Sequence, residues 1–211
     1  SLQAAIKRLC DEAVEAVKGG AVLLIVSDRE IGKELIQIPA PLSVGAIQQR
    51  LVETNLRCDA NIVVETGSAR DPHHFAVLIG LGATAVYPYL AYESLANMVS
   101  RGAISKPLRV VTANFRNGIN KGLYKIMSKM GISTISSYRC ARLFELVGIG
   151  NEVAEVCFKG MVSRINGAGF AELEGDLKRF HKNAWRKSQS LDAGGFLKYK
   201  PQGEYHMYNP D

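Results

Sequence analysis

Polar residues with the potential for chemistry follow three short apolar segments of the sequence. Asp28 and Glu65 are the two carboxylates among them, and each comes at the end of an apolar run. Two such carboxylates can form an acid–base pair. Groups of this kind more often cap helices and pair with arginine, which holds loops in place. We favour the structural role and keep the catalytic one open. The full set is Ser27, Asp28 and Arg29 after the first segment, Glu65, Thr66 and Arg70 after the second, and Tyr87 and Tyr89 at the third.

A second candidate site is the stretch KIMSKMGISTISSYRC (125–140), which combines lysine with several hydroxyl side chains. Apolar residues spaced by three or four predict an amphipathic helix that runs into it, with Met127 near the buried face. Lys129 then lies in the last turn, where the helix dipole favours a cation, and Gly131 provides the left-handed residue that ends the helix. We therefore expect a structural joint rather than a catalytic loop. The apolar positions are Phe115, Ile119, Leu123, Ile126 and Met130.

The sequence offers little for metal or phosphate binding. Adjacent residues of a helix point about 100° apart, so His73 and His74 cannot easily bind one metal ion, and we expect hydrogen-bonding roles for both. The glycine turns GLGA (80–83) and NGAGF (166–170) lack the spacing that cradles phosphates. The cysteines form no CxxC pair and adjoin no histidine, which predicts small buried residues in a reducing compartment. They are Cys10, Cys58, Cys140 and Cys157.

The elements that position these residues alternate between helix and strand. An uninterrupted apolar run such as AVLLIVSD (21–28) is typical of a strand covered on both faces. The pattern predicts an α/β fold with a parallel sheet and right-handed crossovers, either an open layer or part of a barrel. In such sheets the chemistry lies beyond the carboxyl ends of the strands. The expected helices are 2–17, 43–55, one opened by Asp71 and Pro72, 91–100, 112–130, 137–147 capped by Ser136 or Ser137, and 170–186; the expected strands are 21–28, 61–65, 84–89 and 132–135.

Charge and hydropathy limit the classes of partner. The net charge is +6, but the densest basic run, KRFHKNAWRK (178–187), lies on a helix with an apolar stripe at 170, 173, 177, 180 and 184. We expect the remaining basic residues to be scattered with acidic residues between them, and no nucleic-acid partner. No apolar run reaches the roughly 18 to 20 residues of a membrane span, and no signal peptide is evident, so we expect a cytoplasmic protein without a membrane partner.

Four stretches in order along the chain resemble one family. They are IVSDREIGKELIQIPAPLSVGAI (25–47), VVETGSARDPHHFAVLIGLGATAVYPYLAYE (63–93), GLYKIMSKMGISTISSYRCARLFE (122–145) and GEYHMYNP (203–210). They are similar to the large subunit of glutamate synthase, in the central domain and the segment leading to the flavin-binding barrel. Two departures from the family pattern are Gln48–Gln49–Arg50 in place of a histidine-rich run, and Cys140 where glycine is usual, which puts close backbone packing at that turn in doubt.

The resemblance implies a division of labour within a longer polypeptide. The family makes two glutamates from glutamine and 2-oxoglutarate: an amidotransferase domain releases ammonia, which passes through a tunnel to a barrel that holds flavin mononucleotide (FMN). It also uses a 3Fe-4S cluster, with NADPH, NADH or ferredoxin as reductant. We expect residues 1–150 to form the β/α central domain and 151–211 a helical and extended linker toward the barrel. The last 25 residues, rich in glycine, proline and polar groups, are typical of an extended arm.

The resemblance also implies that this piece carries no catalytic residue, metal or cofactor of its own. Its expected partners are the amidotransferase and FMN-binding domains, with a small subunit or ferredoxin in the parent enzyme. The candidate coupling or tunnel-edge residues are Ser27, Asp28, Glu65 and Arg70. Two alternatives stay open: a small stand-alone enzyme that uses Asp28, Glu65 and Lys129, and a basic nucleic-acid-binding module.

Overall fold

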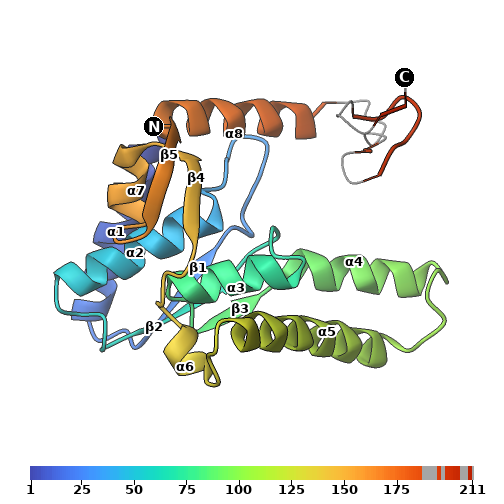
Figure 1. The fold of residues 1–211 in the computed structure, drawn as a ribbon, viewed down its shortest axis with the longest axis horizontal. Helices are drawn as coiled ribbons and strands as arrows, with labels where there is room; N and C mark the ends of the chain where they lie inside the picture. The colour runs from blue at the N-terminus through green and yellow to red at the C-terminus, as the bar shows by residue number, and fades with distance from the viewer. Residues whose placement is uncertain (187–193, 196–197, 205–208, 211) are drawn as a thin grey trace.

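The computed structural model describes residues 1–186, 194–195, 198–204 and 209–210. Its first half is an α/β layer built on a three-stranded parallel sheet in the order β1-β2-β3 (Figure 1). The expected parallel sheet is therefore confirmed, as an open layer and not a closed barrel within the described residues. Its elements are α1 (Leu2–Lys18), β1 (Leu23–Ser27), α2 (Ala40–Glu53), β2 (Asn61–Glu65), α3 (Pro72–Leu81) and β3 (Ala85–Tyr87).

Local sequence signals account for these elements. Ser1 caps α1 through a hydrogen bond from the backbone N–H of Ala4, and the helix buries a stripe of apolar side chains. Asp71 caps α3 as predicted, because its carboxylate accepts from the backbone N–H groups of His73 and His74 while Pro72 fills the first helical position. The buried stripe of α1 consists of Leu2, Ile6, Cys10, Ala13, Val14 and Val17.

The sheet is covered on one face only, which corrects the expectation that β1 is covered on both. Side chains of a strand alternate between faces. One set packs toward the helices, where Ile62 and Val64 are fully buried. The opposite set is open, and Leu23 and Ile25 are 50% and 64% exposed. An apolar run of this kind indicates burial on both faces of the sheet, but the helices of the described residues cover only one face.

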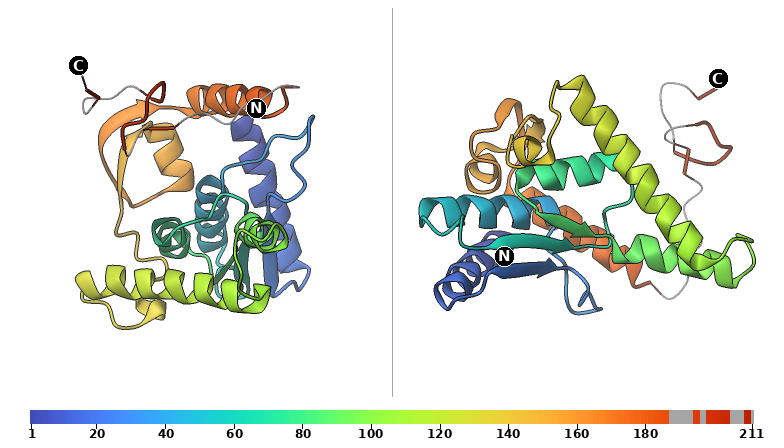
Figure 2. Two further views of the ribbon diagram at one scale, coloured as in Figure 1. Left: turned by 90° about the vertical axis from the view of Figure 1, so that its right-hand side faces the viewer. Right: turned by 90° about the horizontal axis from the view of Figure 1, so that it is seen from below.

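Two long helices extend from the sheet as a hairpin (Figures 1 and 2). They are α4 (Tyr89–Ser100) and α5 (Leu108–Lys129), and α5 packs against α3. Met127 is buried on α5 as predicted, whereas Met130 is 39% exposed. After α5 the chain turns into the short helix α6 (Ile135–Tyr138), whose Tyr138 is fully buried and donates a hydrogen bond to the carbonyl of Ala76, 3.1 Å away.

The segment after α6 differs from the sequence-based expectation. The predicted strand 132–135 is absent, and the predicted helix 137–147 is replaced by β4 (Glu145–Ile149), so Ser136 and Ser137 cap no such helix. Cys140 and Arg142 adopt positive φ angles of 63° and 54°, which end any helix at this point. β4 pairs in parallel with β5 (Val162–Ala168), and α7 (Asn151–Cys157) connects them.

The last described helix is α8 (Phe170–Ala184), close to the predicted 170–186. Phe170 is buried, and Leu173 and Leu177 pack on the core, but Phe180 is 64% exposed, so the predicted apolar stripe fails at its far end. The β4–β5 pair spans residue 150, where we expected the boundary between domain and linker, and that division stays a prediction. Most of the expected extended arm lies outside the described residues.

Candidate functional site

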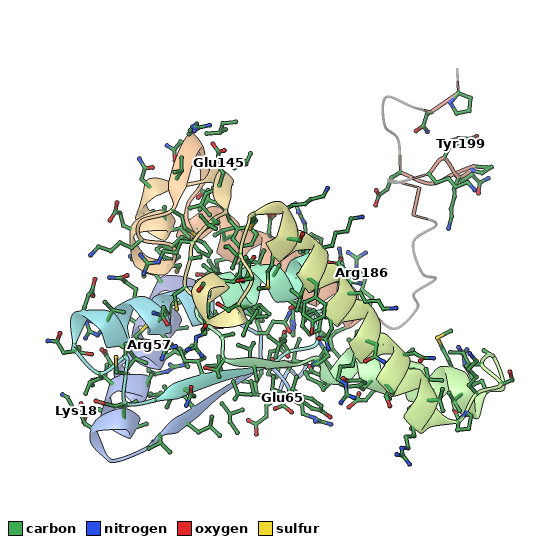
Figure 3. All side chains as sticks on the ribbon, turned by 60° about the horizontal axis from the view of Figure 1, so that its bottom comes forward. Lys18, Arg57, Glu65, Glu145, Arg186 and Tyr199 are labelled. Carbon is green, nitrogen blue, oxygen red and sulfur yellow. The ribbon has the colours of Figure 1, made fainter. Side chains whose placement is uncertain are left out.

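The parallel register brings the predicted polar residues to one edge of the sheet. Ser27, Glu65 and Tyr87 are register partners at the ends of β1, β2 and β3. Figure 3 shows Glu65 at this end of the sheet and Lys18 at the other. Four of the candidates, Ser27, Asp28, Glu65 and Thr66, therefore lie near one another although two come from each of two distant segments.

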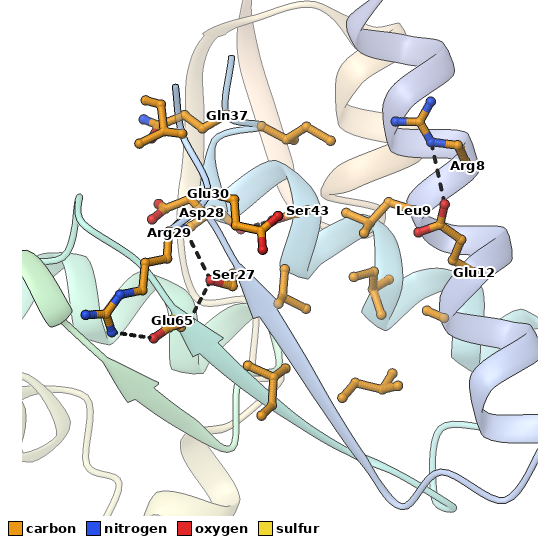
Figure 4. Close-up of a pocket in the computed structure, with 18 of the residues that line it drawn as sticks. Arg8, Leu9, Glu12, Ser27, Asp28, Arg29, Glu30, Gln37, Ser43 and Glu65 are labelled. Atoms are coloured by element: carbon orange, nitrogen blue, oxygen red, sulfur yellow. Dashed lines mark hydrogen bonds and ion pairs between the residues drawn. The ribbon is translucent and has the colours of Figure 1, made fainter. Parts of the chain in front are cut away.

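Glu65 is the centre of a first network, on the open face of the sheet (Figure 4). Its carboxylate accepts from the Ser27 hydroxyl at 2.6 Å and from the Arg29 guanidinium at 3.1 Å. The second guanidinium nitrogen of Arg29 donates to Glu93 on α4 at 2.9 Å. The hydrogen bond from Ser27 and the charge of Arg29 lower the pKa of Glu65. Glu65 is therefore a stable carboxylate at neutral pH and a poor proton donor.

Asp28 is the centre of a second network, directed toward the helices. It accepts from the Thr66 hydroxyl at 2.5 Å and from the Gly67 backbone N–H at 2.9 Å. Burial, with the Asp28 carboxylate nearby, raises the pKa of Tyr89 to about 12. Thr66 is only 1% exposed, so its hydroxyl depends on protein partners. Asp28 thus joins the end of β1 to the loop that follows β2.

Arg29 links the two networks without bringing the carboxylates together. Its guanidinium carbon lies 5.1 Å from the centre of the Tyr89 ring, in cation–π range. The carboxylates of Asp28 and Glu65 belong to separate sets of hydrogen bonds and share no hydrogen-bonding partner among the described residues. This arrangement supports the structural role over the acid–base pair.

Arg70 is not part of either network. Its side chain is exposed and makes no hydrogen bond or ion pair with another described residue, and its backbone N–H donates to Nδ1 of His74 at 3.2 Å. Tyr87 is 44% exposed and lies against Tyr92, with ring centres 5.9 Å apart. The edge therefore collects Ser27, Asp28 and Glu65 but leaves Arg70 outside.

The segment 125–140 is a structural joint. The Gly131 N–H bonds to the Ser128 carbonyl at 3.1 Å and the Ile132 N–H to the Met127 carbonyl at 3.0 Å, the paired bonds of a Schellman cap. Gly131 has the expected left-handed φ of 71°, and Lys129 is exposed in the last turn of α5. This position fits a role for Lys129 in stabilising the helix dipole. Among the described residues, no side chain pairs with Lys129 in a way that indicates a chemical role.

The remaining polar motifs have structural surroundings. His73 lies edge-on to Phe144 at 6.1 Å, and in the described part of the chain no three side chains of His, Cys, Asp or Glu gather to hold a metal ion. Cys10 and Cys157 are buried, as predicted for all four cysteines, but Cys58 is exposed and Cys140 is half-buried. Gly82 has a φ of 126°, so the GLGA turn is a helix end.

Sequence reasoning missed three features. Gln48 is nearly buried, and Arg57 donates to it and to the carbonyls of Ala60 and Gly82, which ties α2 to the ends of β2 and α3. A cleft of about 850 Å³ runs beside β1. The third feature is a stretch of the chain in which basic residues are not accompanied by acidic ones.

The positive charge is concentrated on the α4–α5 hairpin and the segment after it. Between Glu93 and Glu145 the sequence has no acidic residue, so the expected scatter of acids among basic residues is wrong for this stretch. The basic side chains of α5 are all exposed, and none forms an ion pair with a described residue. The basic residues of the stretch are Arg101, Lys106, Arg109, Arg116, Lys121, Lys125, Lys129, Arg139 and Arg142.

Comparison with known proteins places these features in a family. Residues 1–150 match the family described as "Glutamate synthase central domain". The chain belongs to the glutamate synthase central domain family. It is 39% identical over 220 residues to ferredoxin-dependent glutamate synthase of Pyropia yezoensis, a match that covers 98% of this chain and 14% of that protein.

Other glutamate synthases show similar matches. The NADH enzyme of Schizosaccharomyces pombe is 40% identical over 215 residues, covering 98% of this chain and 10% of that protein. The NADPH large chain of Bacillus subtilis is 37% identical over 211 residues, covering 99% and 14%. The chain thus spans between a tenth and a seventh of these relatives. Their names include three different reductants, so similarity alone does not select one.

The location of this glutamate synthase domain in the cell stays a prediction. Among the described residues, no helix has both the length and the apolar character needed to cross a bilayer. The names of some relatives, such as two from Arabidopsis thaliana, carry the word chloroplastic.

Proposed function

We propose that this chain is the connecting and coupling part of a glutamate synthase that makes two glutamates from glutamine, 2-oxoglutarate and reductant. The observation that supports the proposal is the pair of fully satisfied networks at the carboxyl edge of the sheet. Asp28 and Glu65 are held by hydrogen bonds and an ion pair, and the pKa of Glu65 is lowered. Such an edge is polar, and the carboxylates of Asp28 and Glu65 are both engaged in hydrogen bonds.

In this proposal the edge faces the path of ammonia between two catalytic domains of the same polypeptide. A wall of that kind excludes water and offers a few fixed hydrogen-bonding groups, without reacting itself. Ser27, Asp28 and Glu65 provide such groups. Arg70, which is exposed and separate from the networks, would contact a neighbouring domain rather than the wall.

The proposal assigns all cofactors to other parts of the parent enzyme. FMN and the 3Fe-4S cluster would be held by the barrel, and electrons would come from NADPH, NADH or ferredoxin through a separate domain or subunit. The isolated chain 1–211 should then bind no FMN and catalyse neither glutaminase nor glutamate synthesis. Flavin titration and both assays on the purified chain test this.

The same assays distinguish the stand-alone enzyme. Stoichiometric FMN, or turnover by the isolated chain that falls with Asp28→Asn at unchanged stability, would favour an independent catalyst at the sheet edge. The nucleic-acid alternative has one observation in its favour, the acid-free basic stretch that includes α5. Salt-dependent binding of oligonucleotides tests it, because phosphate contacts weaken steeply as salt rises. We expect no such binding.

A further inference from the structure

A cleft lies beside β1, the end strand of the sheet. It holds about 850 Å³ and lies between α1, β1 and the loop that follows β1 (Figure 4). Its walls are apolar along most of their length, with Leu9 and Ala13 from α1, Leu24 and Val26 from β1, and Ile38 from the loop. Polar residues also line it, with Arg8 and Glu12 on α1 and Ser27 and Glu65 at the strand ends.

β1 presents a free backbone edge to this cleft. The Val22 carbonyl accepts from the Asn61 N–H, and the Asp28 N–H donates to the Glu65 carbonyl, so even-numbered residues of β1 turn their backbone toward β2. Leu23, Ile25 and Ser27 must therefore turn theirs outward. β1 is the end strand of the sheet in the order β1-β2-β3. An exposed edge of this kind is a template for another strand.

The order of the helices shows where that strand belongs. α2 connects β1 to β2 and contacts both, and α3 follows β2 and contacts β3. The helices lie side by side in the order α1, α2, α3, with α1 packed on α2. Right-handed crossovers keep each helix over the pair of strands that it connects. By the same rule α1 covers the gap between β1 and a strand beyond it.

We propose that this cleft is occupied by a β-strand that pairs in parallel with β1 and leads into α1. The occupant is a segment of the same polypeptide that precedes Ser1. The chain corresponds to only 10 to 14% of the length of its relatives, so residues outside it are available in proteins of this family. The proposal requires a longer polypeptide, and it does not depend on the coupling role of Glu65.

Hydrogen exchange at single residues tests the proposal without a mutation. In the chain 1–211, the amides of Ile25 and Ser27 should exchange rapidly, while those of Leu24 and Val26 are protected by β2. In the natural longer polypeptide, Ile25 and Ser27 should gain protection on the order of tenfold or more, because each would donate to the added strand. Unchanged exchange at Ile25 and Ser27 in the longer polypeptide would overturn the proposal.

A matched pair of proline variants gives an independent readout. Ile25→Pro removes an outward N–H and should be tolerated in the chain 1–211 but destabilise the longer polypeptide, whereas Val26→Pro should destabilise both. Equal effects of Ile25→Pro in the two proteins would contradict the added strand. Protection of Ile25 that appears in the chain 1–211 only as its concentration rises, together with dimer formation, would assign the edge to a second copy and overturn the proposed source.

Discussion

Replacing Asp28 by alanine should destabilise the fold without removing any reacting group. Its carboxylate accepts from the Thr66 hydroxyl and from the Gly67 N–H, and these bonds join β1 to the loop after β2. Alanine removes the acceptor of both bonds. The Thr66 hydroxyl keeps Ser68 as a second partner at 2.9 Å, so the two lost bonds count at the low end of their range.

The magnitude follows from the number of lost bonds. A hydrogen bond to a charged group contributes about 1.5 to 3 kcal/mol, and two such bonds at the low end give about 3 kcal/mol. Asp28→Asn keeps an oxygen for the Gly67 N–H and should cost about 1 kcal/mol. Urea unfolding of the chain 1–211 measures both. With a slope of about 2 to 3 kcal/mol per molar urea, Asp28→Ala should lower the midpoint by about 1 to 1.5 M.

Glu30→Ala provides the matched control. Glu30 is an exposed carboxylate two residues along and has no hydrogen bond or ion pair with a described residue, so its loss should leave the midpoint nearly unchanged. An Asp28→Ala midpoint as close to wild type as that of Glu30→Ala would refute the anchoring role.

Three further predictions concern single groups. Because the pKa of Glu65 is lowered in the folded protein, its ionised carboxylate stabilises the fold above the ordinary value of 4.5, and this stabilisation is lost as pH falls through the lower folded pKa. Glu65→Gln should therefore make the free energy of unfolding fall less steeply with pH on the acid side. An unchanged acid dependence would refute this. Burial raises the pKa of Cys157 to about 12, so iodoacetamide should modify the exposed Cys58 and leave Cys157 unmodified until the protein unfolds. Mass spectrometry measures this, and equal rates of modification at the two cysteines would contradict the burial of Cys157. Cys140→Gly should raise the free energy of unfolding by about 0.5 kcal/mol, because glycine relieves a left-handed φ at some entropic cost, and a loss of about 1 kcal/mol in urea unfolding would count against this.

The parts of the fold that the sequence predicts are those with local signals. The apolar run of β1, the spacing of α1 and the Asp71–Pro72 start of α3 each need only a few neighbouring residues. The segment after α6 fails because its course depends on Cys140 and Arg142 at positive φ, which neither residue type favours. β4 also requires β5 as a partner, and pairing of that kind is not encoded locally.

The position of the site could be predicted from the sequence, but its hydrogen bonds could not. Residues after parallel strands must share an edge, which gathers Ser27, Asp28 and Glu65. Their partners depend on which face each side chain takes and on distant residues such as Glu93, which lies 64 positions from Arg29. The sequence did not predict the exposed face and edge of β1, because an apolar run indicates that a strand is buried but not which segment covers that strand.

The coupling role is tested most directly by Glu65→Leu in the natural full-length enzyme, read as the rate of glutamate synthesis from glutamine divided by the rate from added ammonia. Glu93→Leu is the matched control, because it removes the other carboxylate partner of Arg29 from α4. Thermal unfolding of both variants checks that the domain remains folded, since an unpaired arginine can destabilise it.

We predict that Glu65→Leu lowers this ratio and lets glutaminase run without matching glutamate formation, because an apolar side chain at the strand ends obstructs transfer and leaves both active sites intact. Glu93→Leu should keep the wild-type ratio. An equal loss of the two rates in folded Glu65→Leu enzyme, or a ratio indistinguishable from that of Glu93→Leu, would contradict the coupling role.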